Sequence, residues 1–306
     1  MLNLLLQTTI EGAHDDWNVD RFSRLTAFLS GVLDKSGKPA FRVTARNRAP
    51  RGKPDPVLSN LHQSDFHQLW LFAVDVGDGL TPEDCASIGR FWREGGSLMV
   101  TRDHMDLGSS ICALGDVGAA HHFHTRNCEP DVGRHRIDDP FTANISWPNY
   151  HSGANGDFQR VWPVGSAHPL VLDPQSDTGV IQYLPAHPHE GAVSAPSNDP
   201  SARVVLEGQS LVSGRRFNIA VAFERSPHGG RAAAQSTFHH FADYNWDPAA
   251  GSPSFVTETP GDAIVRCPEA LRSTKQYVRN IAFWLGAGVV RRATSAEGAS
   301  LESVGT

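Results

Sequence analysis

The first hundred residues alternate between short apolar runs and longer amphipathic stretches, a pattern that predicts strands and helices in turn. The apolar runs hold few polar residues, as strands do when helices cover both faces of a parallel sheet. Four such strands are expected, at Leu2–Thr9, Phe41–Ala45, Leu69–Val74 and Ser97–Thr101. The alternation favours an α/β fold built on a doubly wound, mostly parallel sheet.

Two helices are predicted between these strands. The first, Val19–Leu33, places its large apolar side chains on one face. The second begins after Thr81, whose hydroxyl can cap the helix, with Pro82 at the first helical position and a Gly-Gly pair at its end. Cys85 shares a face of this helix with Trp92, so we interpret it as a core residue rather than a nucleophile.

The second half of the chain is less regular and predicts loop and strand insertions. Residues 126–165 are rich in Pro, Gly, Asn, Asp and His, which indicates a long structured excursion. Short strands are expected at Val180–Leu184, Arg203–Leu206, Phe217–Phe223 and Ala232–Phe238, with a closing helix at Ser273–Leu285. We expect a single domain over residues 1–290 and a flexible tail over residues 291–306.

Composition narrows the class of protein. The formal net charge of -6 argues against nonspecific binding of nucleic acid, which needs a basic surface. Four scattered cysteines without a CxxC pair suit a reducing compartment. The apolar N-terminal run is too short for a signal peptide or a membrane span. We therefore expect a cytoplasmic protein with no nucleic-acid or membrane partner, and the pattern is compatible with a homo-oligomer.

Polar residues follow the predicted strands at positions where ligands collect. In doubly wound sheets, ligands bind outside the carboxyl ends of the strands at the point where strand order reverses. That rule places the site near His14–Trp17 after the first strand, Asp75–Asp78 after the third and Arg102–Asp106 after the fourth. We predict that His14, Asp103 and His104 converge in one cleft. The alternative for the third group is an internal Arg102–Asp103 ion pair that stiffens the turn.

The chain contains fifteen histidines, and three groups of them are clustered, at His121–His124, His187–Glu190 and His239–His240. The last group continues into Asp243 and Asn245 among aromatic residues, which suits a pocket for a polyhydroxylated ligand such as a sugar. If His239 and His240 lie on a strand, only one of them faces the site. The alternative is a strand end that is packed by aromatic rings and binds nothing.

Metal and cofactor motifs are weak or missing. His187 and His189 with Glu190 form a possible ligand set for a divalent metal, but no His or Cys spacing matches a recognised zinc pattern, so the ligands stay unassigned. The sequence holds neither GxxxxGK[ST] nor GxGxxG, which argues against nucleotide binding, and no GxSxG elbow.

The chain resembles the ThuA-like (trehalose-utilisation type) branch of the class I glutamine amidotransferase-like superfamily. The early loop with His14-Asp15, the TPED helix followed by REGGSLMV, the strand leading into His239-His240-Phe241 and the helix YVRNIAFWLGAG carry the resemblance. It implies a flavodoxin-like sheet with a site at the turn after the fourth strand. In amidotransferases this turn bears a thiol, whereas residues 102–104 include neither Cys nor Ser. Cys112 lies beyond the turn, in an expected helix at Leu107–Leu114.

These observations predict a ThuA-like protein that binds or converts a small, carbohydrate-like molecule without a thiol nucleophile. Asp103, His104 and His240 are the expected catalytic residues of a His/Asp or metal-dependent hydrolase or sugar-converting enzyme. The expected ligand-binding residues are His14, Asp15, Arg102, His239, Asp243 and Asn245. One alternative is a non-catalytic binding module that kept the fold, and another is amidotransferase chemistry through an unexpected thiol.

Overall fold

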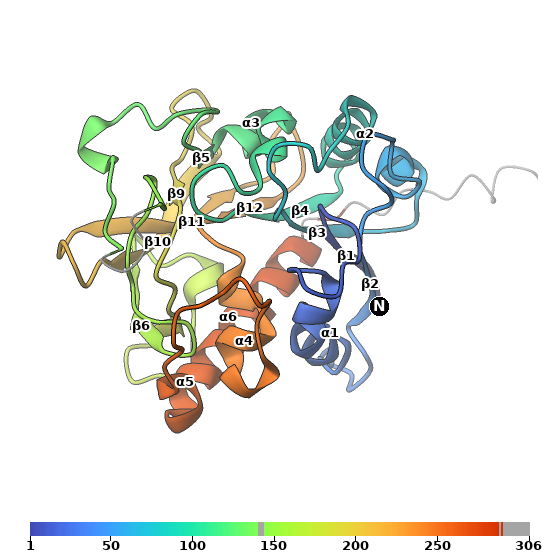
Figure 1. Ribbon diagram of the computed structural model, residues 1–306. Coiled ribbons are helices and arrows are strands. Elements are labelled where there is room, and N and C mark those ends of the chain that lie inside the picture. The colour runs from blue at the N-terminus through green and yellow to red at the C-terminus, as the bar shows by residue number, and fades with distance from the viewer. Residues whose placement is uncertain (140–143, 288, 290–306) are drawn as a thin grey trace, which may run out of the picture.

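A central sheet organises the protein. The computed structural model describes residues 1–139, 144–287 and 289, and Figure 1 shows their course. The eight-stranded sheet has the order β2-β1-β3-β4-β12-β11-β10-β7. Its strands are β1 (Leu2–Thr8), β2 (Phe41–Arg46), β3 (Gln68–Phe72), β4 (Ser97–Thr101), β7 (Trp162–Pro163), β10 (Ala202–Gln209), β11 (Arg216–Phe223) and β12 (Ala232–Gln235). The tail predicted at residues 291–306 lies outside the described residues.

The first five strands of this order are parallel and form a flavodoxin-like arrangement. β1 pairs in parallel with both β2 and β3, β3 pairs with β4, and β4 pairs with β12. The order β2-β1-β3-β4-β12 confirms the predicted doubly wound, mostly parallel sheet and puts its switch point between β1 and β3. β11, β10 and β7 extend the sheet in antiparallel fashion beyond β12.

Insertions in the second half form two small sheets of two strands each. β5 (His121–His122) pairs with β9 (Ala192–Val193), and β6 (Phe158–Arg160) pairs with β8 (Tyr183–Pro185). These segments lie beside the antiparallel half of the main sheet (Figure 1). These two small sheets confirm the predicted loop and strand insertions.

Helices cover both faces of the sheet, as the apolar strands require. Leu4 and Leu6 of β1 face one core, to which α1 and α6 contribute, whereas Leu5 faces a second core with α2. The helices are α1 (Ser23–Ser30), α2 (Pro82–Arg93), α3 (Gly115–Ala119), α4 (Asp243–Trp246), α5 (Ala263–Arg266) and α6 (Pro268–Ala287). Within the described residues, none of these helices is long and apolar enough to cross a bilayer.

Short 3-10 turns replace part of the expected helical structure. They are η1 (Val19–Phe22), η2 (Leu58–Gln63), η3 (Ser109–Ala113), η4 (Val132–Arg134), η5 (Pro169–Val171), η6 (His239–Phe241) and η7 (Pro248–Ala250). The predicted helix Leu107–Leu114 is therefore wrong, because only the short turn η3 forms there. Gly108 directly before η3 has a left-handed φ of +89°, which is incompatible with an α-helix through this position.

The predicted helix Val19–Leu33 is also too long. The α-helix covers only Ser23–Ser30, because a residue distant in sequence caps its start. The carboxylate of Asp243 accepts hydrogen bonds from the backbone N–H groups of Ser23 and Arg24, at 3.0 and 2.9 Å. A tertiary cap of this kind leaves no local signal in the helix itself.

Two strands of the second half differ from their prediction. Of the segment predicted at Val180–Leu184, only Tyr183 and Leu184 lie in a strand, β8, because Ser273 Oγ on α6 accepts hydrogen bonds from the N–H groups of Gln182 and Tyr183. β12 ends at Gln235 rather than at Phe238, whose N–H donates to the carbonyl of Arg102 instead. His239 and His240 consequently lie on the turn η6 and not on a strand.

α2 follows its prediction closely. Thr81 and Asp84 form a reciprocal capping box at its start, and Pro82 is its first residue. Cys85 is buried on its apolar face, and burial raises the pKa of its thiol to about 11. Thiolate is the reactive form of cysteine, so this side chain is inert at neutral pH.

We expect Cys85 to react slowly with a thiol reagent in the native protein, because it is both buried and protonated. Exposed Cys128 supplies the internal control. Peptide mass spectrometry after timed labelling with iodoacetamide should show modification of Cys128 well before Cys85, by roughly a hundredfold in rate. Equal rates at the two positions would contradict a structural role for Cys85.

Candidate metal centre

A cavity of about 280 Å³ opens at the carboxyl ends of the parallel strands. Its wall includes Trp17 from the loop after β1, Val74 after β3, Asp103 and His104 after β4, and His239 after β12. The cavity thus spans the switch point between β1 and β3, where the topology of the sheet predicts a ligand.

Asp103 stands at the centre of a cluster of imidazoles and is 2% exposed. Its Oδ1 lies 3.2 Å from His187 Nε2. Its Oδ2 lies 3.2 Å from His104 Nδ1 and 3.8 Å from His239 Nε2. Despite this proximity, Asp103 Oδ1, His187 Nε2 and His104 Nδ1 are buried atoms without a hydrogen bond of acceptable geometry.

Two asparagines determine which nitrogens of His187 and His239 carry a proton. Asn245 Nδ2 donates to Asn155 Oδ1 at 2.8 Å and to the carbonyl of Ala186 at 3.1 Å. The remaining Oδ1 of Asn245 must then accept from His239 Nδ1, 2.9 Å away. Asn155 Oδ1 likewise accepts from His187 Nδ1, at 3.0 Å. The proton of each ring thus lies on Nδ1, and the Nε2 of a neutral ring at either position is left as an acceptor on the side of Asp103.

The pKa shifts of His187 and Asp103 follow from burial and from the neighbouring imidazoles. Burial, reinforced by the neighbouring ring of His239, lowers the pKa of His187 well below its usual value, so its imidazole is neutral. Burial alone would raise the pKa of Asp103, but the surrounding imidazoles, His104 first, hold it well below its usual range. The Asp103 carboxylate and the His187 lone pair thus face each other, with His239 Nε2 3.8 Å from the same carboxylate, and a cation between these three groups would satisfy them.

The spacing of these atoms fits a transition-metal ion. Metal–nitrogen and metal–oxygen bonds of about 2.0–2.1 Å place adjacent ligand atoms roughly 3.0–3.5 Å apart. Asp103, His187 and His239 supply one such group of ligand atoms, all within 4.8 Å of one another, and His104, His187 and His189 supply a second. Two histidines and one carboxylate form a donor set that binds zinc or iron(II) and leaves coordination positions open.

Packing holds the ligand rings in place. His239 stacks on Phe238 with centroids 4.2 Å apart and on His187 with centroids 3.6 Å apart. Trp17 meets the edge of His239 at 4.8 Å. Rings that are fixed on both sides lose little entropy when a ligand binds, so the site is preorganised.

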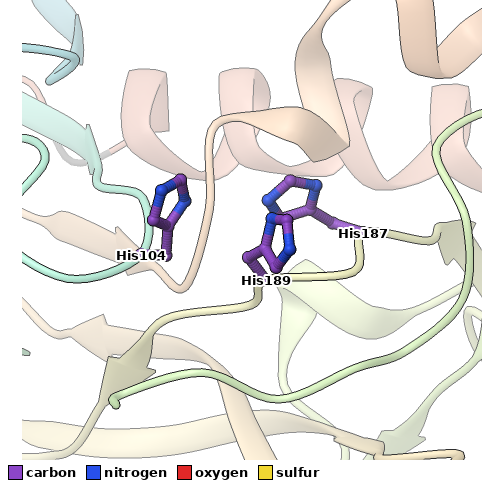
Figure 2. Close-up of side chains that lie close together, drawn as sticks. All are labelled: His104, His187 and His189. Atoms are coloured by element: carbon purple, nitrogen blue, oxygen red, sulfur yellow. The ribbon is translucent and has the colours of Figure 1, made fainter. Parts of the chain in front are cut away.

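His189 completes the cluster from the same loop as His187. Figure 2 shows the imidazoles of His104, His187 and His189 close together, with His104 reaching in from the turn after β4. His189 Nε2 lies 2.7 Å from Asp139 Oδ2 and 3.8 Å from Glu258 Oε1. Burial lowers the pKa of His189, with His104 acting in the same direction. This pair of His189 and Asp139 is oriented for proton transfer at the wall of the cavity.

Of the residues selected from the sequence, Asp103, His104 and His239 line the cavity. Asn245 lies directly behind His239 and orients it. His240 is buried elsewhere, where its Nε2 lies 2.9 Å from Glu190 Oε1. This position supports a structural role for His240 rather than the expected catalytic one.

Arg102 points away from the cavity and does not pair with Asp103. Its guanidinium lies over the ring of Phe123, 4.3 Å from the centroid, and donates to the carbonyl of Met105. The alternative of an Arg102–Asp103 ion pair is therefore wrong. Burial lowers the pKa of Arg102 to about 9. Its position gives no support to a role in ligand binding.

Asp243, Asp15 and His14 also lie outside the cavity wall. Asp243 caps α1, as described above, which accounts for its carboxylate. Asp15 accepts a hydrogen bond from the backbone N–H of Ser254 at 2.7 Å and so ties two loops together. His14 is exposed, although Trp17 of the same loop lines the cavity. Convergence of His14 with Asp103 stays a prediction.

Several residues of the centre were missed or left unassigned by the sequence reasoning. His187 and His189 were noted as a cluster without a fixed geometry, and Trp17 only as the end of the loop selected after the first strand, while Asn155 and Glu258 carry no local signal at all. The third cluster, His121–His124, does not line the cavity, and His121 bonds to backbone carbonyls.

Comparisons with known proteins bear on the fold. No protein-family model and no curated protein sequence matches the chain. The N-terminal domain of mmIFT52 is similar over 94% of this chain and 100% of that domain, at 10% identity and a TM-score of 0.50. A putative thua-like protein from Parabacteroides merdae is similar over 95% of this chain and 92% of its own, at 13% identity and a TM-score of 0.47.

A third similar structure is the glutaminase domain of the Trypanosoma brucei CTPS. It covers 95% of this chain and 96% of that domain, at 12% identity and a TM-score of 0.43. A putative thua-like protein and a glutaminase domain are thus among the structures that are similar to this chain. At identities this low the likeness concerns the fold alone.

Proposed function

We propose that this protein is a metal-dependent hydrolase that holds one divalent transition-metal ion through Asp103, His187 and His239. The observation that carries the proposal is the pair of buried atoms Asp103 Oδ1 and His187 Nε2, which lie 3.2 Å apart without a hydrogen-bond partner, with His239 Nε2 3.8 Å from Asp103 Oδ2. Such an arrangement is costly in a metal-free core and favourable around a cation. When bound, the ion supplies a Lewis acid that activates water near neutral pH.

The chain's own residues supply orientation and proton transfer. Asn155 and Asn245 fix the tautomers of the two ligand imidazoles, as outer partners do in metal sites. His189, held by Asp139, faces the same cavity and is placed to accept a proton from water or to return it to a leaving group. His104 is placed either to complete the ligand set or to bind the reacting group.

A small, carbohydrate-like molecule suits the shape and lining of the cavity. Its volume of about 280 Å³ is in the range of a single small ligand. Trp17 and Phe238 form an aromatic wall against which an apolar ring face can stack, and the metal cluster lies at the polar end. Binding pockets for small molecules commonly combine an apolar or aromatic wall with a small number of polar groups that orient the ligand.

The amidotransferase alternative has no support from the position of Cys112. This residue lies on η3, outside the residues that line the cavity, and burial raises the pKa of its thiol to about 11. A non-catalytic binding module remains the alternative function, and it differs from the proposal in requiring no metal.

Metal analysis of the purified full chain tests the proposal. We expect about one equivalent of zinc or iron after purification or reconstitution. The His187→Ala variant should bind the metal more than roughly 100-fold more weakly, because losing a residue that binds the metal directly costs more affinity than losing its outer hydrogen-bond partner. His168→Ala is the matched control, because His168 is also buried and paired with a carboxylate, that of Glu224, but does not line the cavity. Equal metal contents in the two variants, or none in the native protein, would overturn the proposal.

A further inference from the structure

We infer that the cavity accepts neutral or ammonium-bearing substrates and rejects anionic ones, and that Asp16 and Glu258 set this preference. The inference rests on the proposed metal-dependent function and specifies the class of its substrate. Asp16 and Glu258 line the cavity together with the metal cluster, and both carboxylates are partly exposed. No Lys or Arg belongs to the cavity wall within the described residues.

The cations nearest in sequence are directed elsewhere. Arg102, at the turn that carries Asp103, donates to Met105 and packs on Phe123. Arg21 donates to the carbonyl of Gly251, 3.0 Å away. A substrate with a phosphate or carboxylate beyond the reacting group would therefore meet no basic side chain at the wall, where Asp16 and Glu258 repel it, a cost that a partly desolvated pocket increases.

One hydrogen bond fixes Asp16 at the cavity, and another joins its loop to the loop that bears Glu258. Asp16 Oδ1 accepts from the N–H of Trp17 at 2.7 Å, which fixes the carboxylate next to the aromatic wall. Asp15 on the same loop accepts from the N–H of Ser254, four residues before Glu258. The two loops that bear Asp16 and Glu258 are thus joined directly, so their charges act on the same ligand.

The lining also explains why the rest of the substrate need not be charged. Phe255, which is 58% exposed, and Val256 line the cavity beside Glu258. Apolar contacts on this side and carboxylates at their edge suit a substrate with carbon-rich surface and hydroxyl or ammonium groups. Ammonium groups gain charge-assisted hydrogen bonds from Asp16 and Glu258, which a neutral hydroxyl forms more weakly.

A series of metal-binding probes with different tail charges tests this preference. Butyrohydroxamate, 4-aminobutyrohydroxamate and succinyl monohydroxamate share the metal-binding head and differ in a neutral, cationic or anionic tail. We measure their dissociation constants for the zinc-loaded full chain by calorimetry at low ionic strength. The anionic probe should bind at least tenfold more weakly than the neutral one, and the cationic probe at least as tightly.

Matched variants connect the preference to the two residues. In the Asp16→Asn, Glu258→Gln double variant the three constants should lie within about threefold of one another, because the amides keep the hydrogen-bond acceptors but remove the charges. Asp177→Asn with Glu269→Gln changes the net charge equally at exposed positions outside the cavity and should preserve the preference.

The outcomes separate this inference from the proposed function. Equal binding of the three probes to metal-loaded native protein, tighter binding of the anionic probe, or an unchanged preference in the Asp16/Glu258 double variant overturns the inference alone. A native protein that takes up no metal overturns the proposed function and the inference with it, and metal analysis of each sample identifies this case.

Discussion

Replacing Asp103 with Asn should abolish stoichiometric metal binding and leave the metal-free protein about as stable as the native one. The carboxylate supplies the only negative charge among the three proposed ligands, and its loss should lower metal affinity more than roughly 100-fold. In the metal-free state the new amide can donate to His187 Nε2 or His104 Nδ1, which have no donor now, and this gain offsets the loss of the imidazole contacts that hold the pKa of Asp103 low.

This combination of effects distinguishes a metal centre from a structural ion pair. If Asp103 were held by charged histidines for stability, its replacement would cost about 3–5 kcal/mol. A loss of 3 kcal/mol would lower the melting temperature by roughly 6 °C or more. Thermal unfolding is measured in the presence of a chelator, and metal affinity is measured by competition with a chromophoric chelator.

Asp55→Asn is the matched control for this experiment. Asp55 is also fully buried, and although burial opposes it, hydrogen bonds from Arg46 and from backbone N–H groups lower its pKa to about 2. Its contribution to stability is present above its unfolded pKa near 4 and is lost as the pH falls towards 2. The Asp55 variant should lose stability at neutral pH and retain metal. A destabilised Asp103 variant that also retains metal would refute our assignment.

The second large effect separates His239 from His240, which are adjacent in the chain. His240→Ala should lower the free energy of unfolding by about 3–5 kcal/mol, because it removes the partner of a buried carboxylate. That carboxylate, Glu190, is fully buried and also accepts hydrogen bonds from Ser152 and Ser236. His239→Ala should instead remove metal binding, with a smaller change in the stability of the metal-free protein.

The measurement pairs metal content with chemical unfolding in chelator for both single variants. Adding Glu190→Gln to the His240 variant should recover part of the lost stability, because the buried charge is removed as well. If His240→Ala loses metal and keeps its stability, His240 belongs to the site, as the sequence first suggested. If His239→Ala loses stability alone, the cluster is structural and the proposed centre is wrong.

The structural role proposed for His240 and the metal-binding role proposed for His239 are connected through the loop that carries His187 and Glu190. Glu190 ends the segment that carries His187 and His189, and its contacts with Ser236 and His240 attach this segment to the end of β12. A weakened attachment should therefore also loosen the two loop histidines. This link explains why a buried polar cluster lies behind the candidate centre rather than an apolar core.

The sequence by itself determined the sheet and the location of the site. Apolar runs buried on both faces identified β1, β3 and β4, and the caps of α2 were readable as Thr81, Pro82 and the acidic residues that follow. These signals are local, because the pattern of a buried strand and the cap of a helix are both written in residues that are adjacent in the chain. The rule for parallel sheets then placed Asp103 and His104 at the ligand-binding end, and the missing thiol at that turn was visible directly.

Only the tertiary structure decided which other residues meet Asp103. His187 is 84 residues away in a long insertion, and its contact with Asp103 depends on the path of β8 and the loop that follows it. Asp243 and Arg102 were expected in the site because of their type, yet one caps α1 and the other lies on Phe123. Side-chain direction and long-range contact depend on how the whole chain packs, and hydrophobic periodicity carries neither.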